Sequence, residues 1–449
     1  MVLKQHRQND DVLIIDASKG FVKDGKNNKL RDCDIKRIAD TVRLRSGEPG
    51  FSRKVSRETI RENNYNLNIP RYVDSSEAPE QYDIYATMFG GIPNSEIELL
   101  NKYWEALPSL RRDLFQPAND KPYSVITTDD VSTAIANDED TAKLREGFAK
   151  AFDGFAEELH RRLIINVANV KELKERYEIA DDIFQRLEDI PLIDRYAAYQ
   201  AMSNGWQTIA NDIETLQTDG IDAARVVETA YKLVKKGDED IEVPDGLKGR
   251  IIPFSLVQQV KFQAELQAIN DKEARGEEIE SEINELVDGF TDEESQEYME
   301  GDDNPKLDKA KIKKDAKAKG DDIDPDTKEK LKQFVKLWDE QSKLNKAIKE
   351  EKLTLIDKTK EAIENLTDQE VEQFLHMKWI DPMLEGINGT LTAVLSELEK
   401  QITTLARKYA TSYSDLTEQL ATAQTELSAL VADLTGDEFA LKGLQELNK

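Results

Sequence analysis

The side chains best placed for specific chemistry lie in one short segment, Asn64-Tyr65-Asn66-Leu67-Asn68-Ile69-Pro70-Arg71-Tyr72-Val73. The amides of Asn66 and Asn68 can order a loop through local hydrogen bonds or contact a ligand, and the loop role is favoured. Arg71 can bind a phosphate or pair with a carboxylate. Tyr72 can stack on a base or, as we favour, anchor a core. These four residues form the first candidate site, which is either a ligand-facing or a domain-closing segment.

Neither a metal centre nor a common catalytic motif is indicated elsewhere. His6, His160 and His376 lie far apart, and neither histidine in an expected helix has a Glu, His or Cys at ligand spacing. The chain contains no G-x-x-x-x-G-K-[ST], G-x-G-x-x-G or G-x-S-x-G motif, and Gly90-Gly91 is typical of a turn. Cys33, the single cysteine, is expected to be a packed thiol. We therefore expect no catalytic residue, no cofactor-binding residue and no metal ligand in this chain.

The second candidate site is a leucine-rich heptad pattern near the end of the sequence. Apolar residues recur at alternating steps of four and three, with one interruption near Ser412, which predicts a helix from Leu384 to Leu434 with a single stutter. Such a seam must be covered by the preceding helix, by a second copy or by helices of a partner protein. Its members are Leu391, Leu395, Leu398, Ile402, Leu405, Tyr409, Leu416, Leu420, Ala423, Leu427, Leu430 and Leu434.

The remaining pattern predicts a mainly α protein with a short α/β segment at its N-terminus. Val12-Leu13-Ile14-Ile15 is typical of a buried strand, and a helix capped by Asp32 follows it. We expect five regions, namely an α/β remnant, a mixed connector, a helical domain, a charged linker and a long coiled-coil-like helical hairpin for assembly. They span residues 1–75, 76–139, 140–295, 296–330 and 331–449.

Length and composition restrict the class of protein. The 449 residues suffice for several domains, 39% of them are hydrophobic and 34% are charged. There is no signal peptide pattern and no membrane-spanning run, so we expect a cytoplasmic protein.

The charge is large and unevenly distributed. The formal net charge is −28, yet residues 1–75 carry 16 Lys and Arg against 11 Asp and Glu, a net of +5. The other residues carry a net of −33, which would repel a phosphate backbone over most of the surface. Only the N-terminal segment is therefore suited to face DNA.

Several of these segments resemble the modification (methyltransferase) subunit of type I restriction-modification systems. The likeness runs through Val12-Leu13-Ile14-Ile15-Asp16-Ala17-Ser18 and is most specific in the asparagine-rich segment around Asn66. It continues through Gly90-Gly91-Ile92-Pro93, Leu192-Ile193-Asp194-Arg195-Tyr196, Ile251-Ile252-Pro253, Lys378-Trp379 and Leu405-Ala406-Arg407-Lys408-Tyr409. In that family the first segments close the catalytic domain, so the chain looks like the C-terminal half of such a subunit.

The resemblance implies a role in an adenine-specific DNA methyltransferase. The whole complex, rather than this chain, would use S-adenosylmethionine. The family's adenine-holding loop is [Asp/Asn/Ser]-Pro-Pro-[aromatic], and this sequence contains no Pro-Pro pair. We therefore expect this chain to bind no S-adenosylmethionine and to be inactive alone. The partners implied are a specificity subunit, a second modification subunit, DNA through the complex and a restriction subunit. The heptad seam is the expected contact with the specificity subunit.

A second interpretation does not involve catalysis. The strong negative charge and the long seam also suit a stand-alone acidic helical scaffold or a mimic of the charge of DNA.

Overall fold

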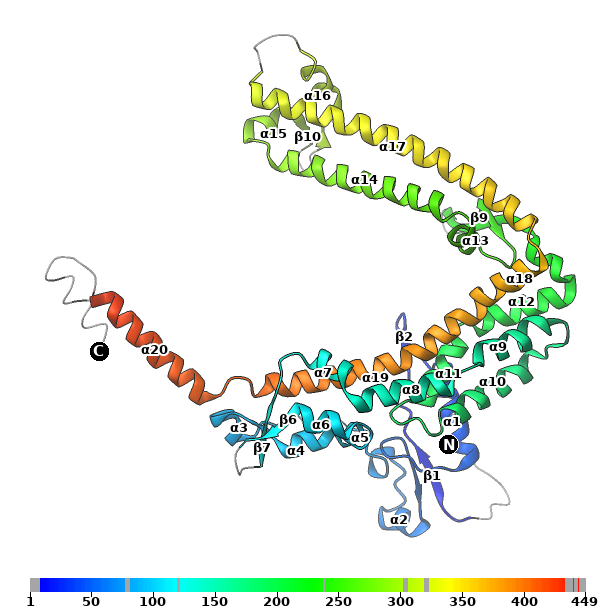
Figure 1. The fold of residues 1–449 in the computed structure, drawn as a ribbon, viewed down its shortest axis with the longest axis vertical. Coiled ribbons are helices and arrows are strands. Elements are labelled where there is room, and N and C mark those ends of the chain that lie inside the picture. Colours follow the sequence, from blue (N-terminus) through cyan, green and yellow to red (C-terminus); the bar gives the residue numbers. More distant parts are fainter. Residues whose placement is uncertain are drawn as a thin grey trace. The chain divides into compact units, whose positions relative to one another are not determined.

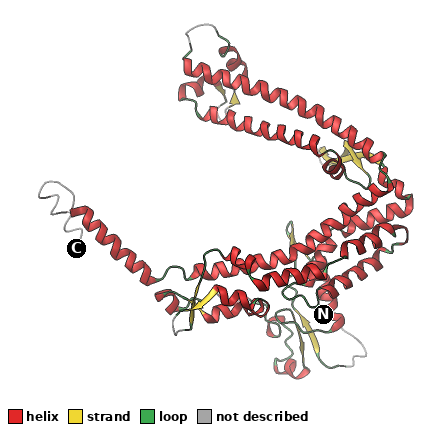
Figure 2. Cartoon of the chain, in the orientation of Figure 1, coloured by secondary structure: helices red, strands yellow, loops and turns green. Residues whose placement is uncertain are grey.

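A computed structural model describes residues 9–76, 81–118, 122–236, 239–301, 306–318 and 323–432, together with Phe439 and Gly443. Helix dominates these residues, and strands occur only in small antiparallel sheets, as Figure 2 shows. The mainly α class predicted from the sequence is therefore confirmed. The chain divides into two compact units (Figure 1). Unit 1 comprises Met1–Arg161, Lys171–Ala210 and Ile380–Lys449, and unit 2 comprises Arg162–Val170 and Asn211–Trp379.

The N-terminal part of unit 1 is a small α/β assembly. The strand expected at Val12–Ile15 is present as β1 and pairs antiparallel with β4 (Ser52–Val55), so that Ile14 lies opposite Arg53. Ile14, Val55, Ile60, Tyr72 and Val73 form its buried cluster. The other elements here are β2 (Val22–Asp24), β3 (Asn27–Lys29), α1 (Asp32–Leu44), α2 (Arg57–Glu62) and the 3-10 turn η1 (Ile69–Arg71).

The middle of unit 1 is a helical assembly around a three-stranded antiparallel sheet. The sheet has the order β5-β7-β6, with β5 at Ile92–Pro93, β6 at Phe115–Pro117 and β7 at Tyr123–Ile126. The helices before and around it are α3 (Ile84–Phe89), α4 (Asn94–Ile97), η2 (Glu98–Leu100), α5 (Asn101–Ala106), α6 (Pro108–Leu114), α7 (Val131–Asn137) and α8 (Glu139–Ala151).

Longer helices complete unit 1. Helices α11 and α19 pack closely at Gly386 of α19. A Cβ placed on this glycine would lie 2.9 Å from the Cβ of Ala201 in α11. A larger residue than glycine at position 386 would therefore push the two helices apart. The remaining helices of unit 1 are α9 (Phe155–Leu159), α10 (Glu172–Arg186), α11 (Arg195–Asn204), α19 (Asp381–Lys408) and α20 (Tyr413–Ala432). The π-helical turn η3 (His160–Ile165) and α12 (Trp206–Asp219) begin in unit 1 and continue into unit 2.

Unit 2 is built on two long helices that lie side by side, α14 (Gln263–Asp288) and α17 (Pro325–Glu364) (Figure 1). Four ion pairs join them, with nitrogen–oxygen distances of 2.5 to 3.0 Å, and we call this set the ion-pair ladder. It consists of Glu265–Lys358, Lys272–Glu351, Glu273–Lys352 and Arg275–Glu340. The helical hairpin expected over residues 331–449 would pair this helix with a later one, whereas in the structure α17 packs along α14, which precedes it in the sequence.

Short elements surround this helix pair. Pro253 precedes α13 (Phe254–Lys261), and a break at Phe262 separates α13 from α14. The remaining helical elements of unit 2 are η4 (Val167–Asn169), η5 (Ile221–Arg225), α15 (Asp292–Tyr298), α16 (Lys309–Asp315), α18 (Asp368–Leu375) and the π-helical turn η6 (His376–Ile380).

The prediction of a charged linker over residues 296–330 is wrong for the described residues of this segment, which help to form a small core. Tyr298, Ile312 and Leu331 are buried together with Phe334 and Trp338 at one end of the helix pair. Two short strands, β10 (Met299–Glu300) and β11 (Lys306–Leu307), pair antiparallel beside them. Apolar residues of this segment share one cluster with the aromatic side chains of α17, which makes a small core possible despite the high charge.

The helical domain expected over residues 140–295 is interrupted by a β-hairpin. Strand β8 (Val227–Lys236) pairs antiparallel with β9 (Glu239–Gly249), and a register shift falls between Thr229 and Tyr231. The β-branched and aromatic side chains of β8 favour this extended form.

In the part of the chain that the structure describes, no helix is long and apolar enough to cross a membrane.

Candidate functional site

The asparagine-rich segment is a folded loop that turns through left-handed backbone. Asn64 and Tyr65 have φ of 54° and 57°, a region in which asparagine is favoured over most residues. The backbone N–H of Asn68 donates to the side-chain oxygen of Asn66 at 2.9 Å. The Asn66 amide thus orders the loop locally, and its side chain stays exposed.

Tyr72 fastens this loop to the N-terminal core. Its ring is buried, and its hydroxyl donates to the backbone carbonyl of Asn66 at 2.5 Å. Arg71, next to it in η1, is exposed, and no ion pair joins it to a carboxylate within the described ranges. The four predicted residues are therefore brought together on one loop, with Tyr72 pointing inward and the Arg71 guanidinium open to solvent.

The first half of the heptad seam is buried inside unit 1. Leu395, Leu398, Ile402 and Tyr409 belong to a core that also contains Trp104, and Leu391 and Leu405 pack at its edge. The partners come from α5 to α8, which cover the apolar face of α19. The three expected coverings were the preceding helix, a second copy and a partner protein, whereas this half is covered by α5 to α8, which lie much earlier in the same chain.

The single helix expected from Leu384 to Leu434 is wrong, because the chain breaks between α19 and α20. Tyr409 donates a hydrogen bond to Glu96 and accepts one from the backbone N–H of Asp83 at 3.0 Å. Burial raises the pKa of the Tyr409 phenol, so it stays a donor at neutral pH. Ser412 then caps α20, accepting from the backbone N–H of Asp415 at 3.1 Å. The stutter in the heptad pattern is thus the point at which helix is replaced by a turn.

The second half of the seam is exposed on α20. The side chains of Leu416, Leu420, Leu427 and Leu430 are 54%, 59%, 55% and 67% exposed. We call these four residues the α20 leucine face. Leu434 lies outside the described residues. Among the described elements, α20 packs on α3, through contacts that include a hydrogen bond of 2.9 Å from Ser414 to the carbonyl of Met88.

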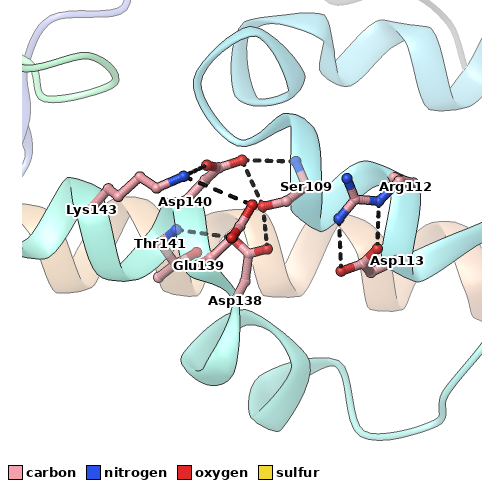
Figure 3. A network of polar contacts seen from close by, with 8 residues as sticks. All are labelled: Ser109, Arg112, Asp113, Asp138, Glu139, Asp140, Thr141 and Lys143. Atoms are coloured by element: carbon pink, nitrogen blue, oxygen red, sulfur yellow. Dashed lines mark hydrogen bonds and ion pairs between the residues drawn. The ribbon is translucent and has the colours of Figure 1, made fainter.

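The sequence did not indicate a polar network between α6 and α8, which Figure 3 shows. The Ser109 hydroxyl lies 2.6 Å from a carboxylate oxygen of Asp138 and 2.6 Å from one of Asp140. Asp138 caps α8 through the backbone N–H of Thr141 at 2.8 Å, and Lys143 bonds Asp140. The hydrogen bond from Lys143, with a second from Ser109, holds the pKa of Asp140 well below its usual range.

This network serves packing rather than catalysis. Its serine faces two carboxylates but no histidine, so no neutral base is placed to activate the hydroxyl. It joins the start of α6 to the start of α8 and thereby positions the helices that cover the seam. Its only sequence signal is an Asp at a helix start, a pattern too common in this acidic chain to single out.

The described residues contain no group of three or more His, Cys, Asp or Glu side chains that could hold a metal ion. His160 and His376 begin the two π-helical turns η3 and η6, and His6 lies outside the described residues. Cys33 is buried on α1, and burial raises the pKa of its thiol. A protonated, buried thiol is a poor nucleophile.

Comparison with known proteins places the resemblance in the N-terminal segment. Residues 1–81 match the family model described as N-6 DNA Methylase. The chain is 39% identical over 85 residues to the type I restriction enzyme MpnII methylase subunit of Mycoplasma pneumoniae, a match that covers 19% of this chain and 16% of the relative. It is 32% identical over 105 residues to the type I restriction enzyme MjaVIII methylase subunit of Methanocaldococcus jannaschii, covering 23% and 17%.

These matches include only a small part of either protein. They span about a sixth of the length of the curated relatives. No solved structure matches the chain. The matched residues 1–81 contain β1, α1 and the loop held by Tyr72. The chain is therefore similar to N-6 DNA methylases over residues 1–81, and to methylase subunits of type I restriction enzymes over 85 to 105 residues.

Proposed function

We propose that this chain is the helical, assembly-bearing part of a type I restriction-modification DNA methyltransferase, equivalent to the C-terminal half of its modification subunit. It docks onto the specificity subunit and onto DNA in the cytoplasm, in a complex with a second modification subunit and a restriction subunit. The similarity of residues 1–81 to N-6 DNA methylases supports the class of enzyme. The observation that carries the docking role is the α20 leucine face, exposed on a helix of 20 residues.

Methyl transfer belongs to the whole complex in this proposal. S-adenosylmethionine enzymes of this class need a glycine-rich turn after a strand to approach the cofactor closely. Here β1 is followed by Asp16-Ala17-Ser18, and every strand pairing among the described residues is antiparallel. These residues do not fit the cofactor, so we assign this chain no step that involves it.

The α20 leucine face suits a helical partner. Its leucines follow the heptad steps of a two-helix seam, and each gains about 1.5–3 kcal/mol when fully buried. Four such side chains would contribute at most about 6–12 kcal/mol, which is of the same order as the cost of association and would form the apolar centre of a larger interface. The exposed guanidinium of Arg71, held beside Asn66 and Asn68, lies in the basic N-terminal segment and is the DNA-facing group of the proposal.

The test compares two double variants in the full chain. Leu420→Ser/Leu427→Ser removes the centre of the leucine face, and Leu99→Ser/Leu353→Ser changes two leucines that are at least as exposed, at 78% and 55%, elsewhere. Each is mixed with the specificity subunit at about micromolar concentration, and the complex is measured by light scattering. We expect the wild type and the control to form the complex and the leucine-face variant to lose it. Two separate peaks for the wild type would contradict the proposal.

The acidic scaffold is the alternative, and the net charge of −28 favours it. Binding of a basic partner through charge weakens steeply as salt rises, whereas an apolar helix interface tolerates salt. The same light-scattering measurement between low and high salt separates the two functions. A complex that dissociates with added salt, and that does not depend on Leu420 and Leu427, would establish the scaffold instead.

A further inference from the structure

The hairpin formed by β2 and β3 has no core of its own. Val22 pairs with Lys29, Lys23 with Asn28, and Asp24 with Asn27, and all six side chains are exposed. Gly25, at the first turn position, has a φ of 58°, whereas Lys26 does not lie in the left-handed region, as in a type II′ turn. The hairpin is thus a narrow two-stranded ribbon whose side chains are exposed to solvent.

The ribbon is the most basic stretch of the described N-terminal segment. Residues 19–31 contain five Lys and Arg against one acid, Asp24. Arg31 is held by Asp34 at 2.9 Å. The ammonium of Lys23 bonds the neutral amide of Asn28 at 2.6 Å, and Lys29 lies 4.0 Å from Asp24 with both side chains about 70% exposed. The carboxylate paired with a ribbon lysine is that of Asp24, in an exposed pair, so residues 22–29 keep a net positive charge.

The lysines lie on both faces and at the tip of the ribbon, an arrangement that matches a groove with negative charge on both walls. Neighbouring residues of a strand point to opposite faces, so Lys23 lies on one face, Lys29 on the other, and Lys26 at the tip. Strands of three residues extend about 10 Å, close to the roughly 8.5 Å depth of the major groove, which at about 12 Å wide admits a two-stranded ribbon. Phosphates line both walls of that groove.

We propose that the β2–β3 hairpin enters the major groove of double-stranded DNA, where Lys23, Lys26 and Lys29 bind phosphates on its two walls. The choice of DNA as the polyanion rests on the proposed function. The hairpin extends the DNA-facing surface beyond Arg71 to a separate element of unit 1. An acidic protein partner would also attract these charges, but it has no groove and would not select duplex over single strand.

The test uses the full chain and a fluorescein-labelled duplex in an anisotropy titration over a range of salt. The variant Lys23→Gln/Lys26→Gln/Lys29→Gln is compared with Lys309→Gln/Lys313→Gln/Lys317→Gln, which removes three exposed lysines from α16 and the turn after it, in unit 2. Both variants change the net charge by the same amount. The three lysine contacts of the hairpin contribute about −2.7 to the wild-type slope of log affinity against log salt.

We expect the hairpin variant to lose most of that slope and to bind about tenfold or more weakly at low salt, while the α16 variant binds as the wild type does. We also expect duplex to bind more tightly than single strand of equal length. Equal loss in both variants, equal affinity for single strand, or no duplex binding by the wild type at about 100 μM protein and low salt would each overturn the proposal.

Failure here is separable from failure of the docking proposal. The hairpin variant leaves α20 unchanged, so it should still form the complex with the specificity subunit in light scattering. Loss of DNA binding with intact docking supports the hairpin role. Intact docking by a wild type that ignores DNA overturns the hairpin role alone. Circular dichroism of the variant, unchanged from the wild type, confirms that the chain is folded.

Discussion

The indole N–H of Trp379 donates a hydrogen bond of 2.9 Å to the carboxylate of Asp212, and both residues are buried in unit 2. The same carboxylate oxygen pairs with the ammonium of Lys378, which also donates to the carbonyl of Ile251 at 2.6 Å. Asp212 thus ties α12 to the π-helical turn η6 and to the segment before α13.

Asp212→Ala should destabilise unit 2 by about 3–5 kcal/mol, because it leaves the Lys378 charge buried without its counter-ion. The matched control is Asp219→Ala, also on α12, whose pair with Arg250 at 2.7 Å is well exposed and should cost under about 1 kcal/mol. Urea denaturation with hydrogen exchange of α12 peptides measures both. Equal effects would mean that the buried pair contributes no more than a surface one.

The same substitution should lower the stability of the protein strongly in the first half of the heptad seam and hardly at all in the second half. Leu398 is fully buried, so Leu398→Ala should cost about 2–5 kcal/mol through lost contacts and a cavity. Leu420→Ala removes an exposed side chain and should stay within about 0.5 kcal/mol. Thermal unfolding of the two variants checks this. A large loss for Leu420→Ala would show that α20 is covered in the isolated chain.

Removal of α20 should leave the rest of the chain folded. Among the described elements it packs on the short helix α3, and its leucines bury little area. A chain that ends at Ser412 should therefore unfold within about 2 °C of the full chain. Differential scanning calorimetry measures the midpoint. A drop of many degrees would show that α20 contributes to the core of unit 1.

Lowering the pH should reduce the stability of the end of unit 2 that contains α15 and α16. Burial opposes ionisation of Glu294, but hydrogen bonds from the backbone of Thr291, from Lys330 and from Thr327 outweigh it and lower the pKa to about 2 from 4.5. Because the pKa is lower in the folded state, the stabilisation is present above about pH 4.5 and is lost as pH falls toward 2.

Hydrogen exchange of peptides from residues 291–301 at a series of pH values, corrected for the intrinsic exchange rate, should show this loss. Glu294→Gln should already be destabilised at neutral pH and should change less between pH 4.5 and 2 than the wild type does. Identical pH profiles for the two proteins would exclude Glu294 as the titrating group.

Periodicity predicted the elements that bury one face. The capping residue Asp32 predicted α1, the alternating apolar spacing predicted α19, and the apolar run predicted β1. The buried side is clear for α19, whereas Ile35 and Val42 of α1 are 52% and 53% exposed. The same spacing could not say which half of the seam is covered. Leu398 and Leu420 occupy equivalent positions in the apolar repeat. They differ because α5 to α8 pack over Leu398.

Long-range contacts account for what the sequence did not predict. Tyr298 and Ile312 lie in a segment too charged to suggest a core, and their burial depends on Phe334 and Trp338 of α17. The network of Ser109 with Asp138 and Asp140 joins residues about thirty positions apart. At the asparagine-rich loop, by contrast, Asn66, Asn68 and Tyr72 interact within six residues, and local sequence was enough to indicate an ordered loop.

The ion-pair ladder has a consequence for the dimensions of unit 2. The pairs Glu265–Lys358, Lys272–Glu351 and Glu273–Lys352 join two antiparallel helices, and all three correspond to nearly the same alignment of α14 with α17. A slip of one turn would bring the buried Ile269 to the place of Glu265, opposite Lys358, and would part the other pairs as well. At about 1.5 Å per residue, α17 with 40 residues is about 60 Å long, and α14 with 26 residues pairs with it over about 39 Å, so the helix pair can transmit a displacement along this length without the two helices sliding past each other.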